Sequence, residues 1–495
     1  MSNYYIMKER DLYNIRYGSL TRVAGWLMLF ECALMLLPLT VAICLGESDW
    51  HSLLIGAGAS GGAGAIAVAF TRGEHTRLSR REGYLLISVI WILFSLFGML
   101  PFIFCKTPLG VSDAFFETMS GFTTTGATVI SDVESMSRSL LLWRALIQWI
   151  GGLGIVLFLI AVLPALNDSG GISLFNAEIT GMTHDKLHPQ IRRTAASLWA
   201  VYLVLTLLLI PLLMIGGMSC FDSLCQSLTT LSTGGFSTRN ASIGAWGSPY
   251  IASVMSVFML LGGVNFILLY NMSRGHWESV RRNDVIRIYL LFILIATAVI
   301  ALCLGLGGIA SGGDGLVVQP LFQVASAITS TGFTYGDFSV WGPLPLLTVM
   351  LLMLTGSCAG STTGGIKIDR IVALIKNLKS EIIYTLYPNH IIRIKVGGNW
   401  VQDRVLMRVM GFITIYLITV FFGAAAMSAY GYEAIDSLFA SASCMGNSGL
   451  GYGATGAGFG ALPAPLKWIF SFQMLIGRLE IFTVLVLFYR PFWKR

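Results

Sequence analysis

The sequence predicts an all-α polytopic membrane protein built from four helix–pore-loop–helix repeats, with two extra transmembrane helices at the N-terminus. Three observations lead to this fold class. The composition is too apolar for a water-soluble domain, apolar runs recur along the chain, and a short polar segment interrupts them at four similar places. The composition indicates that the protein lies in a lipid bilayer, the apolar runs give the number of spans, and the polar segments indicate a repeat.

The composition excludes a soluble globular protein. Hydrophobic residues make up 55% of the 495 residues, charged residues only 12%, and the mean hydropathy is +0.74. A soluble domain carries about 25% charged residues. The net charge of +7 does not indicate a nucleic-acid partner, because the basic residues are concentrated in alternate connections between apolar runs.

Ten apolar runs are long enough to cross a bilayer, since a helix of about 20 residues spans roughly 30 Å of hydrocarbon. The predicted spans are 20–45, 51–70, 83–105, 139–165, 195–218, 249–271, 286–308, 345–375, 405–429 and 466–489. Lys and Arg gather in every second connection, so the positive-inside rule predicts that these connections and both termini are cytoplasmic. The opposite connections are acidic, and an acidic outer face would gather cations.

Four similar polar breaks lie on the acidic side. They read "DAFFETMSGFTTTGAT" (113–128), "FDSLCQSLTTLSTGGFS" (221–237), "PLFQVASAITSTGFTYGDFS" (320–339) and "DSLFASASCMGNSGLGYG" (436–453). Each begins near an Asp or Pro, continues for roughly ten small and apolar residues, and reaches a Ser/Thr/Asn–Gly step. This pattern predicts a spanning helix, a half-helix, a polar strand and a second spanning helix, four times over.

The repeats divide the chain into five predicted parts. These are an N-terminal two-helix extension (1–82), repeat 1 (83–193), repeat 2 (194–284), repeat 3 (285–400) and repeat 4 (401–495).

Irregular backbone at membrane depth is tolerated only where it is buried in protein or lines a water-filled cavity. Four such breaks therefore predict a shared central ion pathway. A half-helix directs the negative end of its dipole inward, and the strand after it exposes carbonyls that replace the hydration shell of a cation. The alternative is close packing of small residues between membrane helices. That alternative fits one isolated Ser-Thr-Gly triplet better than four copies at equivalent places.

These residues resemble the Trk/Ktr/HKT superfamily of potassium transporters, and within it the bacterial TrkH/TrkG branch. "WRALIQWIGGLGI" (143–155), "TSTGFTYGDFSVW" (329–341) and "TGSCAGSTTGGIKIDRI" (355–371) are similar to motifs of that branch. The resemblance covers nearly the whole chain. It implies K⁺ uptake across the bacterial inner membrane, by a homodimer that works with a cytosolic nucleotide-binding Trk regulatory subunit.

The resemblance also implies one filter glycine in each pore loop, and a glycine at all four places implies K⁺ rather than Na⁺. The fourth loop, "CMGNSGLG", departs from the S/T-T-G pattern. The predicted filter residues, which alone would hold the K⁺, are Thr124, Thr125, Gly126, Thr233, Gly234, Thr331, Gly332, Asn447, Ser448 and Gly449.

The span 345–375 contains a predicted gate, "GSCAGSTTGG" (356–365). Each glycine costs about 1 kcal/mol against alanine in a helix, so this segment should break the helix below the filter, and the family resemblance implies an intramembrane gating loop. The alternative is a simple kink, with Lys367 and Asp369 marking the cytoplasmic exit. The residues assigned to the gate are Gly356, Gly360, Gly364, Gly365, Lys367 and Arg478.

Arg478 lies about a dozen residues into the last predicted span, and Glu480 follows two residues later. Intramembrane charges usually face a pore or a partner, and positions i and i+2 do not share a helix face. We therefore expect Arg478 to face the pathway and to contact carbonyls or hydroxyls of 356–365, closing the path electrostatically.

Two functions fit the pattern. The first is a gated, channel-like K⁺ uptake protein. The second is a secondary transporter of a small organic solute with a broken-helix site at the midplane, which four half-helices of like orientation disfavour. The chain has no G-x-x-x-x-G-K-S/T loop, so we expect neither ATP hydrolysis nor another enzymatic activity, and no cofactor besides the transported K⁺.

Overall fold

The computed structural model describes residues 15–73, 78–154, 191–281, 283–309, 312–388 and 393–493, and nearly all of their regular structure is helical. Within these ranges, the one strand pairing joins β1 (Lys395–Val396) to β2 (Asn399–Trp400) in a short antiparallel ribbon. The predicted all-α fold class is therefore confirmed, with this ribbon as a small addition.

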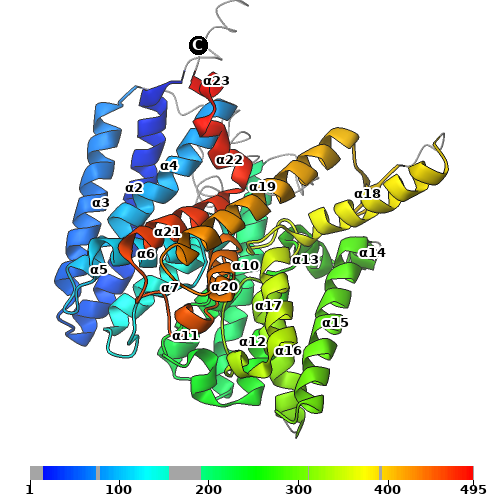
Figure 1. The fold of residues 1–495 in the computed structure, drawn as a ribbon. Helices are drawn as coiled ribbons and strands as arrows, with labels where there is room; N and C mark the ends of the chain where they lie inside the picture. The colour runs from blue at the N-terminus through cyan, green and yellow to red at the C-terminus, as the bar shows by residue number, and fades with distance from the viewer. Residues whose placement is uncertain are drawn as a thin grey trace, which may run out of the picture.

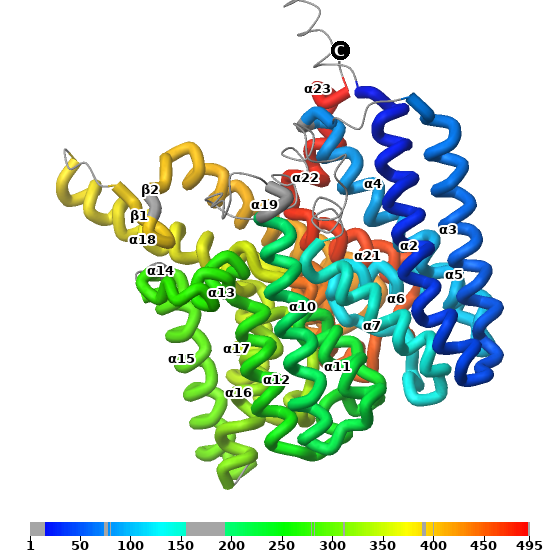
Figure 2. Tube along the Cα trace, turned by 180° about the vertical axis from the view of Figure 1, so that it is seen from behind, coloured from blue at the N-terminus to red at the C-terminus, as the bar shows by residue number. Residues whose placement is uncertain are grey.

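The two predicted N-terminal helices are α2 (Tyr17–Leu45) and α3 (Trp50–Phe70), which pack side by side at one edge of the molecule (Figure 1). Small residues allow this close approach. A Cβ built on Gly64 would lie 2.8 Å from the carbonyl oxygen of Gly25, so the two backbones touch as in other small-residue membrane interfaces. The first turn of α2 and the C-terminal α23 lie at the same end of the molecule (Figures 1 and 2).

Each repeat contributes an outer helix, a half-helix and an inner helix, and the inner helices of repeats 2, 3 and 4 are broken. Repeat 1 contains α4 (Arg80–Gly98), α5 (Leu100–Ile103), α6 (Val111–Phe122) and α7 (Arg138–Leu153). Repeat 2 contains α10 (Ile191–Ile215), α11 (Cys220–Leu231), η2 (Ser242–Trp246), α12 (Pro249–Gly262), α13 (Phe266–Ser273) and α14 (Trp277–Arg281). Repeat 3 contains α15 (Asp284–Leu306), η3 (Asp314–Val318), α16 (Gln319–Ile328), η4 (Phe338–Trp341), α17 (Pro343–Thr355) and α18 (Ile368–Leu386). Repeat 4 contains α19 (Asp403–Ser428), α20 (Ala434–Met445), η5 (Gly453–Thr455), α21 (Ala464–Leu479), α22 (Ile481–Leu485), η6 (Val486–Phe488) and α23 (Arg490–Trp493).

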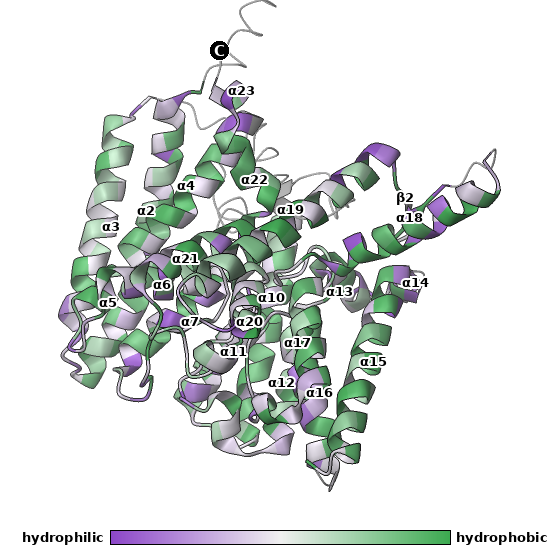
Figure 3. Cartoon of the chain, viewed as in Figure 1, coloured by the Kyte–Doolittle hydropathy of each residue, from purple (hydrophilic) through white to green (hydrophobic). Residues whose placement is uncertain are grey.

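The half-helices α6, α11, α16 and α20 are too short to cross a membrane. They have 12, 12, 10 and 12 residues, and 12 residues extend only about 18 Å. Their last turns are almost fully buried, whereas the outer helix α15 is hydrophobic along most of its length (Figure 3) and exposes apolar side chains. Leu290, Leu294 and Ile295 of α15 are all more than half exposed, which suits contact with lipid.

The number of straight spans differs from the predicted ten. In the described ranges six helices are long and apolar enough to cross a membrane, or up to eight if each of two bent pairs counts as one span. The predicted spans 249–271 and 466–489 are bent, since α12 and α13 meet at 105° and α21 meets the segment Ile481–Phe488 at 112°. The predicted span 139–165 is described only as far as 154.

Candidate ion-conducting site

The four half-helices end in the same backbone turn. In each, one N–H donates to the carbonyl five residues before it, at 2.8 to 2.9 Å, and the preceding N–H donates to the carbonyl three residues before it, at 3.0 to 3.3 Å. These are the two hydrogen bonds of a Schellman motif. The residue at the turn has a left-handed φ although it is not glycine, and the four are Thr124 (53°), Thr233 (53°), Ser330 (47°) and Asn447 (52°). Left-handed residues with side chains cost roughly 1 to 2 kcal/mol each, and such strain is typical of functional sites.

Two residues after each turn a glycine has a left-handed φ. The four are Gly126 (82°), Gly235 (80°), Gly332 (85°) and Gly449 (69°). The predicted alignment of Gly234 with the other filter glycines is therefore wrong by one residue. Gly234 instead matches Thr125, Thr331 and Ser448, each of which directly follows the left-handed residue of its turn.

The four strands close into a ring. A Cβ on each of these glycines would overlap a carbonyl oxygen of another repeat: Gly126 meets Gly234, Gly235 meets Thr331, Gly332 meets Ser448, and Gly449 meets Thr125. Each repeat thus touches the next, and the fourth returns to the first. Only glycine fits here, because both its φ and the neighbouring backbone exclude a side chain.

Main-chain carbonyls are the groups in these strands that suit a dehydrated cation. Several threonine hydroxyls beside the ring hydrogen-bond to the protein instead. Thr123 donates to the carbonyl of Met119 at 2.6 Å and lies 2.9 Å from the hydroxyl of Thr125. Thr125 Oγ1 also accepts a hydrogen bond from Asn447 Nδ2 at 3.0 Å, which joins the loops of repeats 1 and 4.

The shifted alignment in repeat 2 makes a direct prediction. Gly235→Ala should abolish selective flux, because its Cβ would overlap the backbone of repeat 3. Gly234→Ala should reduce Rb⁺ flux several-fold less, because Gly234 has no left-handed φ and its Cβ would displace the Gln148 amide and not the backbone of another repeat. Rb⁺ uptake by proteoliposomes holding equal amounts of each variant checks this ranking. The opposite ranking would restore Gly234 to the filter position.

The inner helix of repeat 3 is interrupted, as predicted. α17 ends at Thr355, and α18 begins at Ile368. The segment 356–367, here called the gating loop, folds back on itself, since a Cβ on Gly365 would lie 2.8 Å from Gly356 Cα. A simple kink is excluded by the twelve residues without helix between the two elements.

The gating loop lies against the turns of three repeats. The Gly364 N–H donates to Ser330 Oγ at 2.9 Å, and the Ser357 hydroxyl donates to the carbonyl of Ile328 at 2.8 Å, both in repeat 3. Thr362 Oγ1 donates to the carbonyl of Leu231 in repeat 2 at 3.3 Å. A Cβ on Gly364 would overlap the carbonyl oxygen of Gly446 in repeat 4. The loop therefore sits directly behind the four-strand ring.

The other residues assigned to the gate anchor this loop. Gly360 packs on Asn265, between α12 and α13, and its carbonyl accepts the Phe266 N–H at 3.1 Å. Lys367 is only 5% exposed, and its ammonium donates to the carbonyl of Thr363. Under the alternative, Lys367 would only mark the cytoplasmic exit of the helix. Its burial and its hydrogen bond within the loop favour a place in the loop structure instead.

Arg478 joins the gating loop to repeat 1. Its guanidinium donates to the carbonyl of Thr362 in the loop at 2.5 Å, and to the carbonyls of Gly151 and Gly152 at the end of α7. The contact with 356–365 that the sequence predicted is present. The Glu480 carboxylate pairs with Arg370 of α18.

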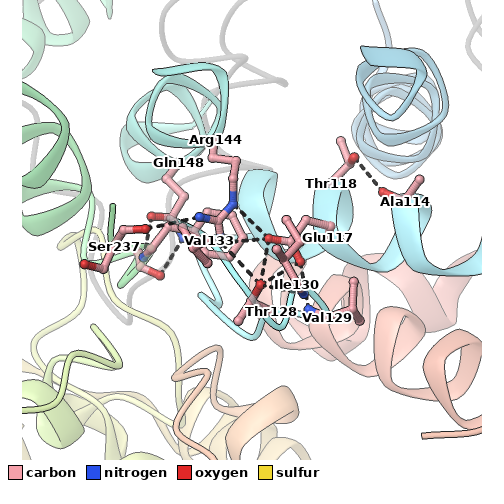
Figure 4. A network of polar contacts seen from close by, with 12 residues as sticks. Ala114, Glu117, Thr118, Thr128, Val129, Ile130, Val133, Arg144, Gln148 and Ser237 are labelled. Carbon is pink, nitrogen blue, oxygen red and sulfur yellow. Dashed lines mark hydrogen bonds and ion pairs between the residues drawn. The ribbon is translucent and has the colours of Figure 1, made fainter. Parts of the chain in front are cut away.

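Sequence reasoning missed several polar residues at this site. Arg370 pairs with Glu480 and lies 4.0 Å from the ring centroid of Phe412. Glu117, Arg144 and Gln148 form a second buried group behind the ring (Figure 4). The signal was available, because each is a charged or amide side chain within an apolar stretch, but their partners lie in distant parts of the chain.

Known proteins share this architecture along almost the whole chain. A family model described as cation transport protein, TrkH, matches residues 63–494. The Trk system potassium uptake protein TrkH of Salmonella typhimurium is 34% identical over 490 residues, which are 97% of this chain and all of the relative. TrkG of Escherichia coli is 35% identical over 481 residues, 96% of this chain and 98% of the relative.

A solved structure agrees with these relatives. The crystal structure of the potassium transporter TrkH from Vibrio parahaemolyticus has a TM-score of 0.87 and 30% sequence identity, and the match covers 97% of this chain and all of that one. The resemblance that the sequence motifs indicated is confirmed. The chain therefore belongs to the TrkH family of cation transport proteins.

Proposed function

We propose that this chain is the membrane subunit of a potassium uptake system and conducts K⁺ through the four-strand ring. The observation that carries this proposal is the closure of the ring, in which four left-handed glycines each abut a carbonyl of another repeat. The names of the relatives, Trk system potassium uptake proteins, support the same function.

The mechanism follows from oriented dipoles. Each half-helix ends at the ring, so the partial negative charge at its C-terminus, about half an elementary charge, stabilises a cation there. The carbonyls of Thr125, Gly234, Thr331 and Ser448 lie where the strands meet, and they replace water around the ion. Inward movement is favoured by the membrane potential, at about 2.3 kcal/mol per 100 mV for one charge.

The outer connections offer the ion an acidic approach. Asp132 of repeat 1 accepts a hydrogen bond from Asn240 Nδ2 of repeat 2 at 2.8 Å. This hydrogen bond lowers the pKa of the exposed Asp132 carboxyl below its usual value. A carboxylate with a lowered pKa keeps its charge to lower pH than an ordinary aspartate, so Asp132 contributes a negative charge to the outer face.

The remaining parts of the proposal concern the setting of the protein. We place it in the bacterial inner membrane with both termini in the cytoplasm, as a homodimer whose gating loop responds to a cytosolic nucleotide-binding regulatory subunit. The basic residues of alternate connections support this orientation. We expect no catalytic residue, no cofactor besides the transported K⁺, and no nucleic-acid partner. The divisions at 82, 193, 284 and 400 stay as working boundaries of the repeats.

The alternative, a secondary transporter of an organic solute, needs a midplane cavity between broken helices. The ring is packed so closely that a single Cβ does not fit between neighbouring strands. This packing suits a bare ion better than an organic molecule.

Growth tests the proposal directly. Expression in a bacterium that lacks K⁺ uptake systems should restore growth on limiting K⁺, because the chain would then supply the missing pathway. The Gly235→Ala variant, checked for equal amounts in the membrane, serves as the control and should not restore growth. Failure of the parent protein to restore growth or Rb⁺ accumulation, together with its regulatory subunit, would rule out K⁺ uptake.

A further inference from the structure

A buried ion pair lies behind the ring in repeat 1 (Figure 4). Glu117 of the half-helix α6 and Arg144 of the inner helix α7 are 2.8 Å apart, and their side chains are 0% and 2% exposed. Removing two charges from water costs several kcal/mol each, and a buried pair recovers this only with good geometry and further hydrogen bonds. Further hydrogen bonds are present here, and they lead to the filter strands.

Glu117 holds the strand of its own repeat. Its carboxylate accepts the Val129 N–H at 2.9 Å and the Thr128 hydroxyl at 3.0 Å. Thr128 and Val129 lie two and three positions after the ring glycine Gly126. Charge-assisted hydrogen bonds of this kind are roughly twice as strong as neutral ones, so the exit of this strand from the ring is firmly placed.

Arg144 and Gln148 hold the strand of repeat 2. They are four residues apart on α7 and so share one face of that helix. Arg144 donates to the carbonyl of Ser237 at 3.2 Å, and its guanidinium lies 4.1 Å from the ring centroid of Phe236. Gln148 Nε2 donates to the ring carbonyl of Gly234 at 2.6 Å, and its Oε1 accepts the Phe236 N–H at 3.0 Å. Both ends of the amide are used, which fixes its orientation.

The group Glu117, Arg144 and Gln148, here called the brace, is found only in repeat 1 among the four repeats as the structure describes them. A glycine of the inner helix contacts the last carbonyl of the half-helix in three repeats, and the pairs are Gly151 with Phe122, Gly262 with Leu231, and Gly477 with Met445. The positions seven and three residues before each glycine are therefore equivalent. They are Arg144 and Gln148 in repeat 1, Met255 and Met259 in repeat 2, and Phe470 and Met474 in repeat 4. In repeat 3, α17 contains no charged or amide side chain.

We propose that Arg144 and Gln148, oriented by Glu117, are positioning residues that set the discrimination of the ring between K⁺ and Na⁺. This inference rests on the proposed function. The carbonyl of Gly234 is held by Gln148 on one side and lies against Gly126 on the other. The Gly234 carbonyl is therefore the point at which the ring strand of repeat 2 contacts repeat 1. A carbonyl that is free to move inward would accommodate the smaller Na⁺, so the brace keeps the ring at the size of K⁺.

The test uses the residue that repeats 2 and 4 have at this place. Gln148→Met should lower the ratio of Rb⁺ to Na⁺ uptake in proteoliposomes about tenfold, with Rb⁺ flux retained; one lost hydrogen bond of about 1 to 1.5 kcal/mol corresponds to such a factor. The double variant Glu117→Gln with Arg144→Met, which leaves no buried charge unpaired, should act in the same direction. Lys467→Met is the control, because Lys467 forms a partly exposed ion pair with Asp113, which lies in the first turn of α6 and not in a ring strand.

Unchanged ratios in Gln148→Met and in the double variant would overturn the proposal, even if thermal stability fell, since a purely structural role alters stability alone. If Gln148→Met does not fold, Gln148→Asn decides, because it keeps the amide but is one carbon too short to reach Gly234. A Gly332→Ser variant measured in parallel separates the two levels. If Gly332→Ser loses discrimination and Gln148→Met does not, only the proposed role of the brace is rejected. If neither variant loses discrimination, the proposal that the ring is the selectivity filter is rejected as well.

Discussion

Gly332→Ser is expected to lower the ratio of Rb⁺ to Na⁺ uptake at least about tenfold. Gly332 has a φ of +85°, and a Cβ there would overlap the carbonyl oxygen of Ser448 in repeat 4. The obstacle is backbone, so no side-chain rotation relieves it, and the ring must open. Opening alters the carbonyl cage that distinguishes the two ions, and 1.4 kcal/mol of altered preference is already tenfold. Gly126→Ser should behave alike, since its Cβ would overlap the carbonyl of Gly234.

Gly46→Ser is the control for backbone strain. Gly46 caps α2 with a φ of +66°, and a Cβ there would have no atom within 4 Å. It therefore carries the conformational cost of a left-handed residue without the overlap. If Gly332→Ser and Gly126→Ser kept the parent ratio in well-folded protein, the ring would not be the selective element.

Arg478→Ala is expected to raise K⁺ flux at least about tenfold in the absence of a regulatory subunit. Two like charges 4 Å apart repel by about 4 kcal/mol at an effective dielectric constant of about 20, so a cation leaving the ring meets a substantial barrier. Arg478 also connects the gating loop at Thr362 to the end of α7 at Gly151. Its removal takes away both the charge and the connection. Selectivity should stay close to that of the parent, because the carbonyls to which Arg478 donates, those of Thr362, Gly151 and Gly152, lie outside the four ring strands.

Arg478→Lys separates the two effects. Lysine keeps the positive charge but is a compact donor that does not match the planar fork of arginine, so it does not bridge the loop and α7 together. A low flux in Arg478→Lys would assign the barrier to charge, and a high flux would assign it to the bridge. Flux through reconstituted Arg478→Ala no faster than that of the parent would make the arginine structural and place the gate elsewhere. Shortening 356–365 should raise flux in the same assay.

The helix break predicted at 356–365 is present, and it could be predicted because it depends on local properties. Four glycines in ten residues weaken a helix wherever it lies, so the break between Thr355 and Ile368 needed no knowledge of neighbours. The intramembrane position of Arg478 likewise required a polar partner. The bends after Gly262 and near Glu480 were not predicted, since a left-handed φ at Glu480, +61°, has no signature in the residue itself.

By itself, the sequence determined the solvent, the orientation signals, the fourfold repeat and the family, because apolar length, charge placement and motif spacing are properties of contiguous residues. Only the tertiary structure decided which glycine of repeat 2 completes the ring, and which side chains brace it. Gly235 is selected by its overlap with Thr331, 96 positions away along the chain, and Gln148 reaches a carbonyl 86 residues away. Such partners meet only when the repeats assemble, because a strand without internal hydrogen bonds takes its register from the neighbours that enclose it.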